Sequence, residues 1–311
     1  MRRECKPEAI LRSYTAALPN WLTFAAARRD AARAYGENAE LWRAVYCPRD
    51  SAAVFFRARA EGRTRNRNDE VAMVVGQALA AWRMGMSVYR FDPDFARALV
   101  DTPLTAGLPA GLLARLPEWG IWVESAGIIP GASGFFAVLD GTEETGVDRA
   151  QITLWLDDDS TLSVPITLEH EGMSLRDSLA AIGVDVDRDD GLRQNGALFA
   201  AAINLTLYLC SAAPEYVGSE RPKNPEPVKT KRGMRLFPAS APRYWDIGKT
   251  VGERLRRAAP RQTTEERNAP RPHLRRAHWH TFRIGEKRAG YRVRWLHPIL
   301  VGYNNDGGND E

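Results

Sequence analysis

Residues 151–168 read QITLWLDDDSTLSVPITL and contain two runs in which apolar and polar residues alternate. The runs 151–156 and 162–168 flank an Asp-Asp-Asp-Ser segment at 157–160, and these residue types favour a tight turn. Alternation on both sides of a turn predicts a β-hairpin. Other strand-like runs lie at 88–91, 120–124 and 134–140. Together these short segments predict a mainly antiparallel sheet.

The sequence around these strands has the spacing of helices. Apolar residues recur at helical intervals through 7–62 and 70–84, and 192–210 is a long apolar run predicted to cross the back of the sheet as a helix. Because helices precede the strands rather than alternating with them, we expect the α+β class: N-terminal helices followed by a mainly antiparallel sheet, with a basic C-terminal helix at 244–258 and a β-hairpin. The predicted division is 1–85 as a helical N-terminal region, 86–213 as a central α+β body, 214–243 as a Pro-rich basic linker, 244–303 as a basic helix plus β-hairpin, and 304–311 as a disordered tail.

Composition indicates a soluble protein of the cytoplasm. The three cysteines, Cys5, Cys47 and Cys210, are far apart and form no CxxC pair, which argues against a disulfide scaffold or a thiolate zinc site. The first residues lead into no apolar segment of signal-peptide type. The longest apolar stretch, 197–210, is too short to span a bilayer, so we expect no membrane partner.

Positive charge is concentrated near the C-terminus. Residues 220–294 contain 21 Lys and Arg but only 7 Asp and Glu, whereas the whole chain of 311 residues has a net charge of only +4. Four of the five histidines and two tryptophans lie in or just beyond the second half of this segment. Cations neutralise phosphates and flat rings stack on bases, so this composition favours a polyanionic partner such as RNA.

The most basic part is predicted to be a β-hairpin formed by 278–284 and 290–296. Alternation puts Tyr291, Val293 and Trp295 on one face of the second strand and Arg292 and Arg294 on the other. Two interpretations stay open: a nucleic-acid-binding surface, or a solvated edge whose charges prevent aggregation. The candidate nucleic-acid-binding residues are Arg271, His273, Arg275, Arg276, His278, Trp279, His280, Arg283, Arg292, Arg294 and Trp295, with Lys229, Lys231, Arg232 and Arg235 as basic residues of the linker.

Other candidate sites are weaker. The histidines His273, His278, His280 and His297 resemble a supply of zinc ligands, but no carboxylate or cysteine lies at ligand spacing, and hydrogen bonding or stacking explains them as well. The acidic groups at 157–159 and 185–190 fit turns better than metal sites, and Glu169-His170-Glu171 has no nucleophile beside it. No GxSxG, HExxH, Walker A or GxGxxG motif occurs. We therefore expect no catalytic residue, no metal and no cofactor.

Many short segments in order resemble the second-named group of type V-A anti-CRISPR proteins. These segments are VYRFDP at 88–93, DTPL at 101–104, LPEW at 116–119, GFF at 134–136, LYLCS at 207–211, KTKRG at 229–233, WDIG at 245–248, RPHLRRAHWH at 271–280 and WLHPI at 295–299. The resemblance covers about residues 70–303, and relatives occur on bacterial plasmids and phages.

The resemblance implies an inhibitor of a type V-A CRISPR effector in the cytoplasm of a bacterial host. Such an inhibitor would recognise the nascent effector polypeptide and lower its messenger RNA rather than block the finished nuclease. A tail that binds RNA or the ribosome suits this role, and an acidic body could bind a basic nascent peptide by strand addition. The alternatives are an RNA- or DNA-binding accessory protein of a plasmid or phage, and a nuclease. The sequence leaves the oligomeric state open.

Overall fold

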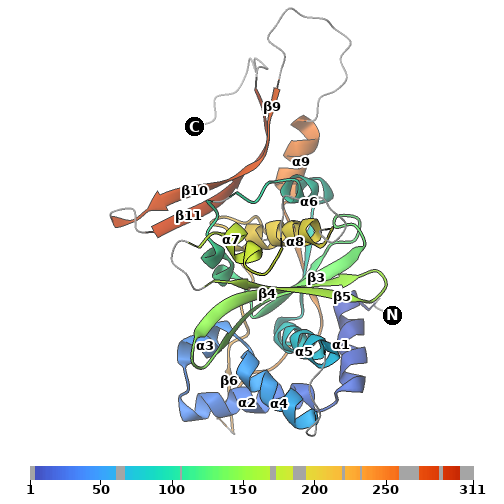
Figure 1. The fold of residues 1–311 in the computed structure, drawn as a ribbon, viewed down its shortest axis with the longest axis vertical. Coiled ribbons are helices and arrows are strands. Elements are labelled where there is room, and N and C mark those ends of the chain that lie inside the picture. The colour runs from blue at the N-terminus through green and yellow to red at the C-terminus, as the bar shows by residue number, and fades with distance from the viewer. Residues whose placement is uncertain are drawn as a thin grey trace, which may run out of the picture.

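A computed structural model describes residues 4–60, 67–105, 107–168, 173–184, 194–218, 221–231, 233–258, 273–286 and 290–301. Its centre is one six-stranded sheet with helices on both faces (Figure 1). The fold belongs to the α+β class, as expected from the sequence. Three segments named in the sequence analysis lie outside the described residues. They are the acidic cluster at 185–190, the histidine flanked by glutamates at 169–171 and the expected disordered tail at 304–311.

The central sheet has the strand order β5-β4-β3-β2-β1-β8. Its strands are β1 (Ser87–Phe91), β2 (Gly120–Glu124), β3 (Ala132–Thr142), β4 (Gly146–Leu156), β5 (Thr161–Thr167) and β8 (Arg243–Ile247). Neighbours from β2 to β5 are antiparallel, whereas β1 runs parallel to both β2 and β8. The predicted hairpin at 151–168 is confirmed as β4–β5, and the sheet is mainly antiparallel.

Strand β8 corrects one prediction. The sequence suggested a helix throughout 244–258, but Arg243–Ile247 forms a strand and only Lys249–Ala258 is helical, as α9. Each of the five residues of β8 pairs with a residue of β1, more than 150 positions earlier in the chain. Such a distant pairing overrides local helical spacing, and Gly248 with φ of 71° separates the strand from the helix.

One face of the sheet is covered by the N-terminal helices. These are α1 (Lys6–Ala17), α2 (Trp21–Tyr35), α3 (Ala39–Ala44), α4 (Arg49–Arg59) and α5 (Arg67–Gly85). In the sheet, Trp122 and Phe136 are opposite one another on β2 and β3, with ring centroids 4.7 Å apart, and both belong to the core beneath these helices. Their neighbours Ile121 and Phe135 point to the other face. The strands are therefore apolar on both sides.

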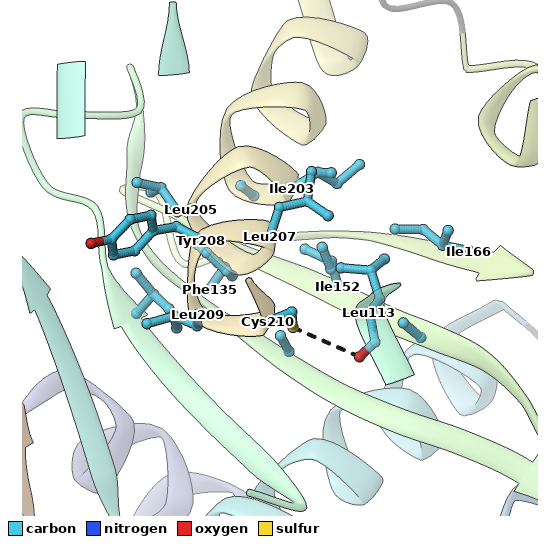
Figure 2. Packing of buried hydrophobic residues seen from close by; sticks show 14 of the residues in the cluster. Leu113, Phe135, Ile152, Ile166, Ile203, Leu205, Leu207, Tyr208, Leu209 and Cys210 are labelled. Carbon is cyan, nitrogen blue, oxygen red and sulfur yellow. Dashed lines mark hydrogen bonds between the residues drawn. The ribbon is translucent and has the colours of Figure 1, made fainter. Parts of the chain in front are cut away.

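The second face carries α6 (Pro93–Val100), the short 3₁₀ helix η1 (Ala110–Arg115), α7 (Leu175–Ala180) and α8 (Gln194–Cys210). Helix α8 lies across the sheet with Ile203, Leu207 and Leu209 buried, which confirms the prediction for this apolar run (Figure 2). At its end, the thiol of Cys210 donates to the carbonyl oxygen of Leu113, 3.8 Å away. Among the helices in the described ranges, none has both the length and the apolar composition needed to cross a membrane.

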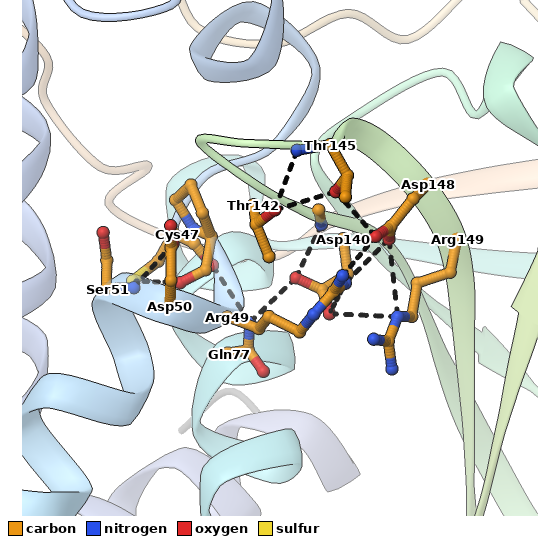
Figure 3. Close-up of polar contacts among 12 residues, drawn as sticks. Cys47, Arg49, Asp50, Ser51, Gln77, Asp140, Thr142, Thr145, Asp148 and Arg149 are labelled. Carbon is orange, nitrogen blue, oxygen red and sulfur yellow. Dashed lines mark hydrogen bonds and ion pairs between the residues drawn. The ribbon is translucent and has the colours of Figure 1, made fainter. Parts of the chain in front are cut away.

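A buried polar network joins helix α4 to the sheet (Figure 3). Arg49 forms two hydrogen bonds to the carboxylate of Asp148 and one of 3.4 Å to Asp140. Gln77 of α5 donates to Asp140 across 3.2 Å and to the carbonyl of Cys47 across 3.1 Å. Burial raises the pKa of Asp140. Burial would also raise the pKa of Asp148, but hydrogen bonds from Arg49 and Thr145 outweigh it and lower that pKa.

We call residues 214–242 the strap; those that the structure describes, 214–218, 221–231 and 233–242, lie mostly outside regular helices and strands. The strap includes a small hairpin of β6 (Val228–Thr230) and β7 (Gly233–Arg235). It contacts the body through Trp119, whose N–H donates to Asn224 across 2.6 Å, and through Arg33, which donates to the carbonyl of Met234 across 3.3 Å. The second contact puts β6 and β7 beside α2, at the far end of the molecule from the C-terminal hairpin (Figure 1).

The predicted C-terminal hairpin is confirmed with the same limits, as β10 (His278–Ile284) and β11 (Gly290–Leu296). Two further strands, β9 (His273–Arg275) and β12 (Ile299–Val301), pair antiparallel at its base. The hairpin reaches out from the body on the side of α6 and α8 (Figure 1). Its backbone is also fixed to the body, since the N–H of Ala212 donates to the carbonyl of Val293 across 3.1 Å.

Asn204 of α8 anchors the hairpin. Its Oδ1 accepts a hydrogen bond of 2.8 Å from Nε1 of Trp279, and its Nδ2 donates to the carbonyl of Thr102 across 2.9 Å. The hydroxyl of Thr102 in turn accepts from Nε1 of Trp295 across 2.9 Å. Asn204 is 1% exposed and Trp279 is 5% exposed, so these groups have no alternative partner in water. A polar residue inside an apolar helix thus joins α6, α8 and both hairpin strands.

Replacing Arg49 by Met should lower the free energy of unfolding by about 3 kcal/mol at neutral pH, because two buried carboxylates lose their main cation and keep only the longer contacts of 3.9 and 3.4 Å to Arg149. Urea denaturation measures this change, and Arg57→Met, an exposed position on the same helix, is the control. The pKa of Asp148 is lower in the folded protein than in the unfolded chain, where it is about 3.9. The ionised Asp148 therefore stabilises the fold above about pH 3.9, and this contribution is lost as the pH falls through the folded pKa. The deficit should therefore shrink below about pH 4. Equal stability of the two variants would contradict this role.

Replacing Asn204 by Leu should cost about 2–4 kcal/mol, because the N–H of Trp279 and the carbonyl of Thr102 lose their partner in a buried site. The matched control is Thr206→Val on the same helix, since Thr206 donates only to the carbonyl of Ala202 one turn earlier. Hydrogen exchange of the β10 and β11 amides should accelerate in the first variant alone. Unchanged exchange in Asn204→Leu would show that the anchor is dispensable.

Candidate nucleic-acid interface

The hairpin has one face against the body and one face in solvent. On the inner face Val293 is fully buried and Trp279 is 5% exposed, while Trp295 packs edge-on against Phe95 with ring centroids 5.1 Å apart. Thr281 donates to the carbonyl of Gly107 across 3.3 Å. These contacts confirm the predicted alternation and fix which side chains point outward.

The outward face combines rings with cations. Paired residues across the hairpin are His280 with Arg294 and Phe282 with Arg292, and all four side chains are exposed. The rings of His280 and Phe282 lie 4.2 Å apart, centroid to centroid, and Phe282 is 39% exposed. Residues directly opposite on a strand pair have neighbouring side chains. A row of rings therefore runs beside a row of guanidinium groups, which suits base stacking next to phosphate contacts.

Many other C-terminal cations are already paired with carboxylates. Arg256 of α9 contacts Asp92 at 3.0 Å and Asp94 at 2.8 Å, which raises the pKa of Arg256 and lowers that of Asp94. Arg243 contacts the buried Glu118 at 3.0 Å, and Lys249 contacts Asp246 at 2.8 Å. In α9 itself, Arg256 is thus paired with the body and Lys249 with β8, while Arg257 contacts Glu253 of the same helix at 3.7 Å. Within the described ranges, the cations without an ion pair include Arg276, Arg283, Arg292 and Arg294.

The structure separates the residues that the sequence grouped as candidates. Trp279 and Trp295 belong to the core side of the hairpin, so we leave their rings out of the outward surface. His278 is half-buried, and its Nδ1 lies 3.3 Å from the carbonyl of Arg276. The backbone of His273 and Arg275 forms β9, but their side chains are outside the described residues, as are Arg271 and Arg232.

The basic residues of the strap form a second, distant group. Lys229, Lys231 and Arg235 are exposed on or beside β6 and β7, next to α2, whereas the hairpin lies at the other end of the molecule (Figure 1). One continuous nucleic-acid surface therefore cannot include both groups without wrapping around the body.

The next candidates are the histidines and acidic residues that the sequence suggested as weaker metal sites. In the part of the chain that the structure describes, no three histidine, cysteine or acidic side chains gather closely enough to hold a metal ion. Asp158 accepts hydrogen bonds from the N–H and hydroxyl of Ser160, and Asp159 contacts Lys6 at 2.7 Å. Asp159 also has φ of 65°, a turn conformation that Asp tolerates. These two residues stabilise the β4–β5 turn.

Sequence reasoning missed the anchor residues Asn204 and Thr102. The signal was present, because an amide inside a long apolar helix is costly unless it finds a partner. Nothing local named that partner, which lies 75 residues further along the chain. Phe282 was also missed as a candidate, although alternation places it on the same face as His280.

Comparisons with known proteins identify the family. The model described as AcrVA2-like, the anti-CRISPR type V subtype A2 family, matches residues 89–303, which is more than half of the chain. The crystal structure of AcrVA2 superposes on this chain with a TM-score of 0.68 at 20% sequence identity, covering 96% of this chain and 100% of that one, and so shows the same fold. No curated protein gives a significant match. The chain therefore belongs to the anti-CRISPR type V subtype A2 family.

Proposed function

We propose that this protein inhibits a type V-A CRISPR effector by acting on its synthesis. The chain would recognise the nascent effector polypeptide in the bacterial cytoplasm and lower the level of its messenger RNA, rather than block the finished nuclease. Membership of the anti-CRISPR family supports the inhibitor role. The observation that carries an RNA-directed mechanism is the outward face of β10 and β11, where His280 and Phe282 lie beside Arg292 and Arg294.

The composition of this face favours RNA over a merely solvated hairpin. A hairpin protected only by charge would keep its apolar side chains inward. Here Phe282 and Ile284 are 39% and 40% exposed, beside arginines that have no ion pair within the described residues. Exposed rings next to cations are the pattern of single-stranded nucleic-acid sites, where stacking contributes about 1–3 kcal/mol per base. Messenger RNA or ribosomal RNA is the single-stranded polyanion that the proposed role provides.

Peptide recognition needs a different surface, because the sheet edges are poorly suited to strand addition. Along β8, the N–H of Val217 already donates to the carbonyl of Asp246 across 2.9 Å. Along β5, Pro165 lacks the N–H that an added strand would need, and the carbonyl of Thr167 accepts from Ser178 across 2.8 Å. The polypeptide is therefore expected to bind by side-chain pockets rather than by extending the sheet.

Replacing Arg276, Arg292 and Arg294 together by Ala should weaken RNA binding and reduce the salt dependence of log K by up to about 0.7 per lost phosphate contact. Fluorescence anisotropy with a labelled single-stranded RNA at several salt concentrations measures both quantities. A triple variant at Arg12, Arg57 and Arg97 removes the same charge elsewhere and should bind as the parent does. If the two triple variants behave alike, the hairpin is only a charged surface.

In bacteria, the parent should lower the messenger RNA of a type V-A effector, and a message with its start codon removed should be spared because no nascent polypeptide forms. Quantitative PCR of both messages measures this difference. Loss of both messages would favour the RNA-binding accessory alternative. Cleavage of labelled RNA by the purified protein, abolished by His278→Ala with His280→Ala, would favour the nuclease alternative.

A further inference from the structure

Two adjoining hollows lie among the N-terminal helices, on the face of the sheet opposite to α8. One, of about 460 Å³, is lined by residues of α1, α4, α5 and the β4–β5 turn, and the other, of about 300 Å³, lies between the α1–α2 connection and α4. They share Leu18 and Arg59. We call the two hollows together the trough; Phe55 lines only the smaller one, Trp155 only the larger one, and Arg59 lines both.

The walls of the trough are mainly apolar. Phe56 and Val75 are buried at its floor, and Val71 is 39% exposed on its side. The polar groups of the larger hollow are partly occupied: Tyr14 donates to the carbonyl of Ala72 across 2.6 Å, and Trp155 donates to Asp159 across 2.9 Å. An open apolar surface of this kind marks a binding site in a soluble protein.

Arg59 determines the charge of the occupant. Its side chain is exposed, and no carboxylate within the described ranges lies at ion-pair distance from it. Two carboxylates also line the larger hollow: Lys6 contacts Asp159 at 2.7 Å, and Asp69 has a partner of its own. The acidity of the body as a whole would favour a basic partner, but Arg59 is the charged residue of the lining that has no ion pair within the described residues. A carboxylate is therefore the group that complements it.

We infer that this trough binds a polypeptide segment in which an acidic residue lies between two apolar side chains. The apolar side chains enter the two hollows, and the carboxylate contacts Arg59 at their junction. The segment is a polypeptide rather than a small ligand because the two hollows adjoin at Leu18 and Arg59, so side chains of one chain can enter both. This inference rests on the proposed recognition of a nascent polypeptide and gives that recognition a location and a chemistry.

The test pans a random peptide display library against the full-length protein and measures the enriched peptides by fluorescence anisotropy. Enriched peptides should carry the apolar–acidic–apolar pattern. Arg59→Glu and Val71→Glu should each weaken binding roughly tenfold, a typical loss at a central contact. The matched controls, Arg57→Glu and Val54→Glu, are exposed changes on α4 outside the trough and should leave binding unchanged. A peptide with Lys in place of the acidic residue should bind Arg59→Glu better than the parent.

The trough is excluded if no peptide is enriched, or if the control variants lose as much affinity as the trough variants. Urea denaturation of all four variants checks that the fold is retained. A second set of overlapping peptides from the N-terminal part of a type V-A effector separates this inference from the proposed function. Binding of library peptides but not effector peptides would retain the trough and reject the effector as target. Effector peptides that bind Arg59→Glu as tightly as the parent would retain the target and reject the trough.

Discussion

The buried amide of Asn204 is the constraint on which the candidate interface depends. An amide within an apolar helix must find partners, because an unsatisfied buried polar group costs about 1–3 kcal/mol. Asn204 finds them in Trp279 and Thr102, and these contacts fix the register of β10 against the body. Side chains alternate along a strand, so an inward Trp279 sends His280 outward. A shift of one residue would bury the histidines and expose the tryptophan. The anchor therefore positions the outward face without being part of it.

Local patterns were sufficient to predict much of the fold. The hairpins β4–β5 and β10–β11 are each specified by alternation and a turn within about 20 residues, and α8 is specified by a long, mostly apolar run. Strand β8 was missed because it is specified by its partner β1, whose position no local pattern reveals. Its own residues, with Trp245 and Ile247 two apart, suit either a short strand or the start of an amphipathic helix. Only the tertiary pairing distinguishes these two.

The charge pattern shows why the candidate site could be predicted only in outline. The sequence presents a single basic segment, but folding distributes it among three environments. Three cations of β8 and α9, Arg243, Lys249 and Arg256, are paired with carboxylates of the body or of β8: Glu118, Asp246, Asp92 and Asp94. Lys229, Lys231 and Arg235 of the strap lie on or beside β6 and β7, next to α2, and the arginines of the hairpin remain available to a ligand. Positive charge along the sequence predicts a candidate site for a polyanion, but most of the acidic residues that pair with these cations come from distant segments, which the sequence does not reveal.

The proposed polypeptide and RNA sites lie on opposite faces of the central sheet and share no residue. The trough is formed by α1, α4, α5 and the β4–β5 turn, whereas the hairpin packs on α6 and α8. Occupancy of one site therefore does not block the other, and both can be filled at once. A nascent polypeptide and its message are held together on one ribosome, so binding to the first raises the effective concentration of the second. Under that condition two weak contacts give strong selection for the message being translated. Neither contact alone needs to discriminate between messages, which agrees with an outward face that has rings and cations but few groups able to read a base sequence.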